Sequence, residues 1–335
     1  MKDSWKELQP GARNAVRVCL NVQPHERVTV ITDTACREIA AALVHEIDAV
    51  GASHAVFVLE DLAPRPLAAL PEAVARDMER SDVSIFAAHA QANELGSRMQ
   101  MTDIVNRRRM RHAHMVNITD QIMRDGMRAD YREVDRLSQR VLDIVRPART
   151  IRATTPAGTD VRASLDPALR WVKTSGLISR DKWGNLPGGE VFTSPGEVNG
   201  RFVIDGVVGD WLCDRYGLLK ATPLTIEIEQ SRLVRATSAN AALRDDFWRY
   251  THTDENSDRV GEFAIGTNIG LTSVIGSILQ DEKFPGVHIA FGNPYGAHTG
   301  ATWYSSTHID VVGTEFDIDV DGVRIMEHGR FLLST

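Results

Sequence analysis

The chain has few cysteines and no long apolar run, and these two absences exclude several classes of protein. The 335 residues contain Cys19, Cys36 and Cys213, and no CxxC pair occurs. A disulfide framework and a thiolate zinc knuckle are therefore excluded, and the composition fits a reducing compartment. No stretch approaches the roughly 20 apolar residues of a membrane helix. The amino-terminal MKDSWKELQPGARNAV also lacks the apolar core of a secretory signal. We therefore expect a cytoplasmic protein without a membrane partner.

Positively charged residues are also fewer than negatively charged ones. Lys and Arg number 38 against 45 Asp and Glu, which gives a formal net charge of −7. Nucleic-acid binding needs basic surface that neutralises phosphates, so this balance argues against a nucleic-acid partner. One basic run, NRRRMRH from Asn106 to His112, is typical of a solvated helix face or turn.

The first half of the chain alternates apolar strands with amphipathic helices. RVTVIT, from Arg27, predicts a buried strand, and Asp33, Thr34 and Gly51 flank the helix predicted over CREIAAALVHEIDAV. Strand–helix–strand order of this kind favours an α/β domain with a mostly parallel sheet. Neither GxGxxG nor GxxxxGK[ST] is present, so a dinucleotide role is unsupported. We expect this half to be a scaffold or one wall of a substrate cleft.

Beyond RPARTIRATTPAGTDVRASL the pattern changes to short strands separated by turns. This half predicts a strand-rich α+β domain with one helix near NAALRDDFWRYTH. We place the boundary near Arg146–Arg152 and expect a scaffold domain over 1–147 and a metal-binding catalytic domain over 148–335.

Four segments of the second half present metal-capable side chains at the ends of short apolar strands. GEFAIG carries Glu262, VHIAFG carries His288, and HIDVVG carries His308 and Asp310, while Glu190 follows a Gly-Gly turn in NLPGGEVFTSP. Residues at i and i+2 of a strand point to the same face, so the last two side chains can reach one metal together. An isolated motif of this kind is weak, but four together predict a metal site.

These segments resemble the metal-binding motifs of the aminopeptidase T family of metallo-aminopeptidases. The resemblance rests on NLPGGEVFTSP, GEFAIG, VHIAFGNPY and HID, which occur in the family's order. It implies a homodimer in which two glutamates, a histidine, a tyrosine and a final His-x-Asp bind a pair of divalent metals. The matching residues are Glu190, Glu262, His288, Tyr295, His308 and Asp310.

The charges of this ligand set favour two metal ions over one. Three carboxylates and a bridging hydroxide would balance two divalent ions, whereas six protein ligands would saturate a single ion and leave no place for substrate. We therefore expect two zinc, cobalt or manganese ions and a hydrolase that cleaves an amide bond of a short peptide or small molecule through a metal-activated water. Glu190 or Glu262 would move the proton, and Tyr295 would be a ligand or a donor to the oxyanion.

Two alternatives remain from the sequence. The family is similar to iron-dependent dioxygenases that open dihydroxypyridine rings, in which a histidine replaces the glutamate at 262 and the glutamate at 190 is missing. That kinship implies a mononuclear iron(II) oxygenase as the rival enzyme. The other alternative is a non-catalytic metal-binding or assembly protein.

One motif imitates a calcium loop. DIDVDG spans Asp317 to Gly322, but Glu327 arrives one position too early for the closing ligand. Alternating apolar residues before Asp321-Gly322 predict a β-hairpin instead.

Overall fold

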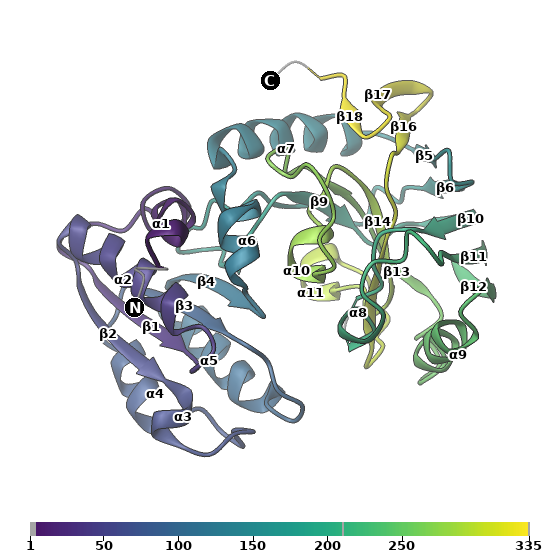
Figure 1. Ribbon diagram of the computed structural model, residues 1–335. Coiled ribbons are helices and arrows are strands. Elements are labelled where there is room, and N and C mark those ends of the chain that lie inside the picture. The colour runs from purple at the N-terminus through teal and green to yellow at the C-terminus, as the bar shows by residue number, and fades with distance from the viewer. Residues whose placement is uncertain (1–4, 210, 334–335) are drawn as a thin grey trace. The chain divides into compact units, whose positions relative to one another are not determined.

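The computed structural model describes residues 5–209 and 211–333, which form two compact units (Figure 1). The first unit comprises Met1–Arg132 and Gly176–Gly188, and the second comprises Glu133–Ser175 and Gly189–Thr335. This division differs from a single boundary at residue 147. The helix before that boundary belongs almost wholly to the second unit, and one later segment returns to the first.

The first unit contains a five-stranded sheet in the order β2-β1-β3-β4-β8, in which every neighbouring pair is parallel. The strands are β1 (Arg27–Thr32), β2 (Ser53–Val58), β3 (Val83–Ala88), β4 (Arg111–Val116) and β8 (Gly184–Asn185). The apolar run RVTVIT is β1, and all its residues after Arg27 are buried. The predicted parallel α/β domain is confirmed.

Helices α2 and α4 both contact β1, and α1 packs against α2. Helix α2 ends at Gly51, whose φ of 85° few other residues adopt without strain. No helix within the described residues has both the length and the apolar character that crossing a bilayer requires. The helices of this unit are α1 (Trp5–Arg13), a π-helical turn (Asn14–Cys19), α2 (Arg37–Val50), α3 (Leu59–Leu62), α4 (Glu72–Met78), α5 (Leu95–Arg108), α6 (Asp120–Arg124) and a 3₁₀ turn (Gly126–Arg128).

The second unit contains two antiparallel sheets, as the α+β prediction requires. The eight-stranded sheet runs in the order β12 (Arg232–Thr237), β11 (Leu224–Glu229), β10 (Glu197–Ile204), β6 (Asp160–Ser164), β5 (Thr150–Thr154), β16 (Asp317–Val320), β17 (Val323–Glu327), β18 (Arg330–Phe331). The five-stranded sheet runs in the order β15 (His308–Val312), β14 (Gly286–Gly292), β13 (Val260–Gly266), β9 (Glu190–Thr193), β7 (Val172–Thr174). The helices are α7 (Tyr131–Val145), α8 (Trp211–Tyr216), α9 (Ala241–Tyr250), α10 (Ile278–Asp281) and α11 (Gly296–Thr299).

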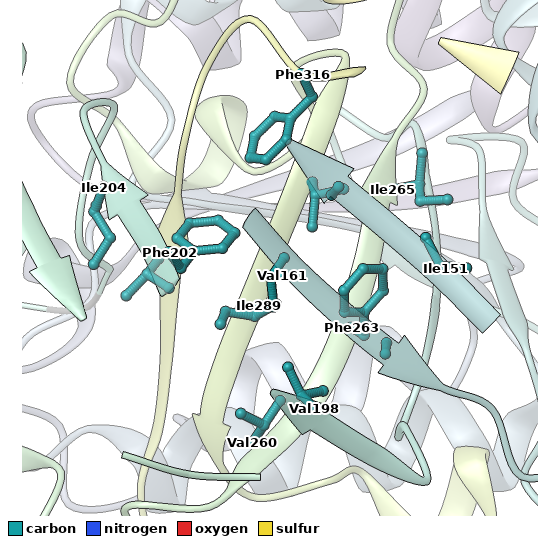
Figure 2. Close-up of a cluster of buried hydrophobic side chains, with 14 of the residues drawn as sticks. Ile151, Val161, Val198, Phe202, Ile204, Val260, Phe263, Ile265, Ile289 and Phe316 are labelled. Atoms are coloured by element: carbon teal, nitrogen blue, oxygen red, sulfur yellow. The ribbon is translucent and has the colours of Figure 1, made fainter. Parts of the chain in front are cut away.

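One apolar core joins the two sheets of this unit (Figure 2). Phe202 and Ile204 of β10 meet Phe263 and Ile265 of β13 and Ile289 of β14, and all five are fully buried. Because strand side chains alternate between faces, the residues between these on β13 and β14 point to the other face of the five-stranded sheet. That second face carries the polar residues of the site.

The DIDVDG segment forms the predicted hairpin. Strands β16 and β17 pair antiparallel, and Asp321 and Gly322 at the turn have φ of 48° and 83°. The Asp321 carboxylate accepts a hydrogen bond from the Thr150 N–H at 2.8 Å, so it ties the hairpin to β5.

Two buried histidines form a polar chain in the first unit. His112 Nδ1 lies 2.8 Å from Ser84 Oγ, and its Nε2 lies 3.2 Å from His114 Nδ1. Burial lowers the pKa of His112 well below its usual value of 6.5 and lowers that of His114 to about 3. Both rings are therefore neutral in the folded protein at neutral pH.

This pair predicts acid sensitivity. Unfolded histidines take up protons below pH 6.5 while the folded rings do not, so the free energy of unfolding should fall as pH drops from about 6.5 towards 3. Each ring contributes up to about 1.4 kcal/mol per pH unit. Urea unfolding at pH 7 and pH 5 should show a smaller loss for His114→Phe than for the wild type. His25→Phe, at an exposed position, should keep the wild-type loss. Equal losses in all three proteins would contradict this account.

Candidate metal centre

Three neighbouring strands of the five-stranded sheet bring a carboxylate, an imidazole and a second carboxylate to one face. Glu262 of β13 and Asp310 of β15 both lie opposite Ala290 of β14, and His288 of β14 lies opposite Ala264. The two alanines leave space between the longer side chains. Glu190 opens β9, the next strand along the sheet.

The donor atoms of these side chains converge. His288 Nε2 lies 3.4 Å from Glu262 Oε1, 3.5 Å from Glu190 Oε2 and 4.0 Å from Asp310 Oδ1. It is buried and has no hydrogen-bond partner among the described residues. Donors at about 2.1 Å from one ion are roughly 3.0–3.4 Å apart. The spacing and the orphaned nitrogen therefore fit a divalent metal.

His308 lies next to Asp310 on the same face, as the i and i+2 spacing predicts. Its Nε2 is 3.5 Å from Asp310 Oδ1, and its Nδ1 is 2.9 Å from the Asn293 carbonyl oxygen. The carbonyl accepts a hydrogen bond from Nδ1–H, so in the neutral ring Nε2 keeps its lone pair for a cation.

Tyr295 lies at the edge of this group. Its ring centroid is 4.5 Å from that of His308, and its left-handed backbone, with φ of 47°, precedes the short helix α11. Tyr295 is 42% exposed as a residue, but desolvation of its hydroxyl, followed by the charges of Glu262 and Asp310, raises the pKa of Tyr295 well above its usual value. The structure thus brings together all six residues that the sequence singled out.

Two further residues complete the group, and sequence reasoning missed both. Lys283 Nζ lies 2.7 Å from Glu190 Oε1 and 2.6 Å from Glu282 Oε1. DEKFPG reads as a solvated turn before β14, because lysine and glutamate are rarely buried. The sequence feature that could have identified them is their position directly before the strand that carries His288.

The charges of the centre shift the pKa values of its residues. Burial disfavours the imidazolium form, but nearby carboxylates outweigh it and raise the pKa of His288 to about 9 and of His308 to about 10. Burial raises the pKa of Glu282 to about 7, against the effect of Lys283. Without a metal, protons on the two histidines therefore compensate the carboxylates.

A second group of possible ligands follows strands β1 and β3 of the first unit. Atoms of Asp33, Cys36 and His89 lie within 4.8 Å of one another. The Asp33 carboxylate already accepts the Cys36 N–H at 2.8 Å and the His89 N–H at 2.7 Å. Burial and the charge of Asp33 raise the pKa of the Cys36 thiol, which stays protonated at neutral pH. We interpret this group as a structural cap of the strand ends.

Comparison with known proteins gives one family and two informative structures. The profile of the thermophilic metalloprotease family (M29) matches residues 114–331. Wild-type AmpT from Thermus thermophilus is similar with a TM-score of 0.69 and 19% identity, over 98% of this chain and 99% of that chain. The 2,5-dihydroxypyridine dioxygenase of Pseudomonas putida KT2440 is similar with a TM-score of 0.70 and 16% identity, over 98% and 97%. No curated protein matches the sequence.

A close approach of two backbones fixes the Lys283 turn against β13. A Cβ on Gly266 would lie 2.0 Å from the Phe284 carbonyl oxygen and 2.9 Å from the Lys283 carbonyl carbon. Neither backbone can move away without disturbing the sheet. Only glycine therefore fits at position 266, because any side chain would overlap the neighbouring backbone.

We expect Gly266→Ala to lower the free energy of unfolding by at least about 2 kcal/mol, because the added methyl group overpacks a backbone contact. Gly184→Ala is the matched control, since nothing lies within 4 Å of a Cβ there. Urea unfolding followed by circular dichroism measures both. Equal midpoints for the two variants would refute the spatial argument.

Proposed function

Because the chain belongs to the thermophilic metalloprotease (M29) family and is a metallohydrolase, we propose that it cleaves the amide bond beside the free amino group of a short peptide or small molecule. The attacking group in this proposal is a metal-activated water. The observation that carries the proposal is the buried donor set around His288 Nε2, which lacks a protein hydrogen-bond partner among the described residues. The other implied properties, a homodimer and a cytoplasmic location, stay predictions.

The metal ligands in this proposal are Glu190, Glu262, His288, His308 and Asp310, and Tyr295 is either a sixth ligand or a donor to the oxyanion. A divalent cation held there would act as a Lewis acid on the scissile carbonyl and lower the pKa of water. The sequence predicts two ions, and Lys283 bears on that number because its ammonium already lies between two carboxylates.

The protein side chains divide the remaining tasks. Asn293 holds His308 in one orientation through its carbonyl oxygen. Glu190 is restrained because its Oε1 accepts hydrogen bonds from Thr174 Oγ1 and Lys283 Nζ, both at 2.7 Å. Among the described residues the Glu262 carboxylate contacts only His288, at 3.4 Å, so we assign proton transfer to Glu262. Tyr295, at the partly exposed edge, would donate a hydrogen bond to the developing oxyanion.

Removing a carboxylate from the donor set should abolish activity and strip metal while the fold remains. Asp310→Ala and Glu262→Ala should each lose at least about 10³-fold in kcat/KM on an aminoacyl p-nitroanilide panel, since a mispositioned or missing cation removes its whole contribution. Elemental analysis should show the metal lost. Asp319→Ala, on the β16 hairpin, is the control that should retain both.

The oxygen dependence of turnover separates the hydrolase from the rival oxygenase. Anaerobic turnover with zinc, cobalt or manganese supports the hydrolase. Turnover that requires both iron and oxygen, or full activity in a metal-free Asp310→Ala protein, would overturn the proposal.

Tyr295→Phe distinguishes a hydrogen-bond donor from a ligand. As a donor to the oxyanion, Tyr295 should contribute on the order of 10²-fold to kcat with little change in metal content or KM. Tyr304→Phe, at a 70% exposed tyrosine of the same loop, should behave as the wild type. A loss of metal in Tyr295→Phe would contradict the donor role and identify a ligand instead.

A further inference from the structure

Lys283 is a buried lysine at the centre of the proposed metal site. Its side chain is 2% exposed, and Nζ lies 2.7 Å from Glu190 Oε1 and 2.6 Å from Glu282 Oε1. Lysine is almost never fully buried unless it is paired, and here it is paired twice. The ammonium therefore occupies the space between two carboxylates.

The turn that carries Lys283 is fixed on both sides. Its carbonyl oxygen accepts the Asn268 N–H at 3.0 Å, and its own N–H donates to the Gln280 carbonyl oxygen at 2.9 Å. The absence of a side chain at Gly266 lets this turn press directly on β13. The ammonium is thus positioned by the fold and is not the end of a mobile surface arm.

Lys283 also occupies a lone pair of Glu190 Oε1 that a metal ion would otherwise use. Glu190 Oε1 accepts hydrogen bonds from Lys283 and from Thr174 Oγ1, which uses both of its lone pairs. The other oxygen of Glu190 is directed towards His288, at 3.5 Å. Glu190 can therefore offer a cation one oxygen at most while Lys283 is in place.

We propose that the Lys283 ammonium permanently takes the place of a second metal ion, so that each chain binds one divalent ion. The inference rests on the proposed metal site and departs from the two ions expected from the sequence. An ion bonded between Glu190 and Glu282 would lie beside a fixed positive charge in a region of low dielectric, where like charges repel strongly. The side chains that Lys283 does not contact still provide enough donors for one ion. They are Glu262, His288, His308 and Asp310.

The charges of the centre are compatible with this number. The carboxylates of Glu190, Glu262, Glu282 and Asp310 face a single fixed ammonium. Together these groups carry −3, so one divalent ion would leave −1 and two would leave +1 before any water or substrate enters. Buried charge of either sign is costly, and the two sums are equal in size. The choice of one ion therefore rests on the space and the lone pairs that Lys283 occupies.

Metal stoichiometry tests the proposal without reference to activity. The full-length protein is loaded with excess Zn²⁺ or Mn²⁺, freed of unbound ion and analysed for metal per chain. One ion per chain is expected, with a single-site isotherm in calorimetric titration. Two ions would overturn the proposal and leave the metal site standing. No bound ion would instead refute the metal site on which it rests.

Substitution of the lysine gives the decisive comparison. Lys283→Met removes the ammonium and should raise the stoichiometry from one ion to two, and a folded variant that still binds one would overturn the proposal. Lys173→Met is the matched control, because Lys173 pairs with Asp135 at 2.9 Å in the same unit and should keep one ion. Circular dichroism verifies folding. If Lys283→Met does not fold, Glu282→Gln keeps the test open: it should retain one ion, and a loss of the ion would contradict the proposal.

Discussion

Buried negative charge is the constraint on which the second unit depends. Glu190 and Glu262 are buried, and with Glu282 and Asp310 they surround a small region on one face of a sheet. A carboxylate removed from water is costly unless a cation or several hydrogen bonds compensate it. Lys283 provides one permanent positive charge, and the raised pKa values of His288 and His308 provide others. Protons and metal ions are thus competing ways of stabilising the same group.

The packing of the two antiparallel sheets makes that concentration of charge possible. One face of the five-stranded sheet is mostly apolar and joins the core through residues such as Phe263 and Ile289. Burial of that face at about 25 cal/mol per Å² of apolar area stabilises the sheet independently of the polar face. The alternation of strand residues then sends Glu262 and His288 to the opposite side, with Ala264 and Ala290 as spacers. A rigid scaffold of this kind tolerates a destabilising site.

The sequence predicts the parts of this arrangement that follow from local periodicity. The i and i+2 spacing of His308 and Asp310 placed both on one face, and Asp321-Gly322 predicted its hairpin. Two features depend on long-range contacts that local periodicity does not reveal. The return of segment 176–188 to the parallel sheet required the pairing of β8 with β4. The burial of Lys283 required knowledge that its turn packs against Gly266.

The reaction is decided by side chains, because the fold alone is shared by proteins of different chemistry. AmpT and the dihydroxypyridine dioxygenase resemble this chain about equally in backbone, at TM-scores of 0.69 and 0.70. Such likeness leaves the function to the site. The carboxylate of Glu262 adds one negative charge beside His288, and Glu190 adds another. A more negative centre holds a Lewis-acidic ion more firmly and demands an additional fixed cation, which is the position Lys283 fills. The charges of Lys283, Glu190 and Glu262 therefore compensate one another. Replacing any one of these residues would change how well the charges of the other two are balanced.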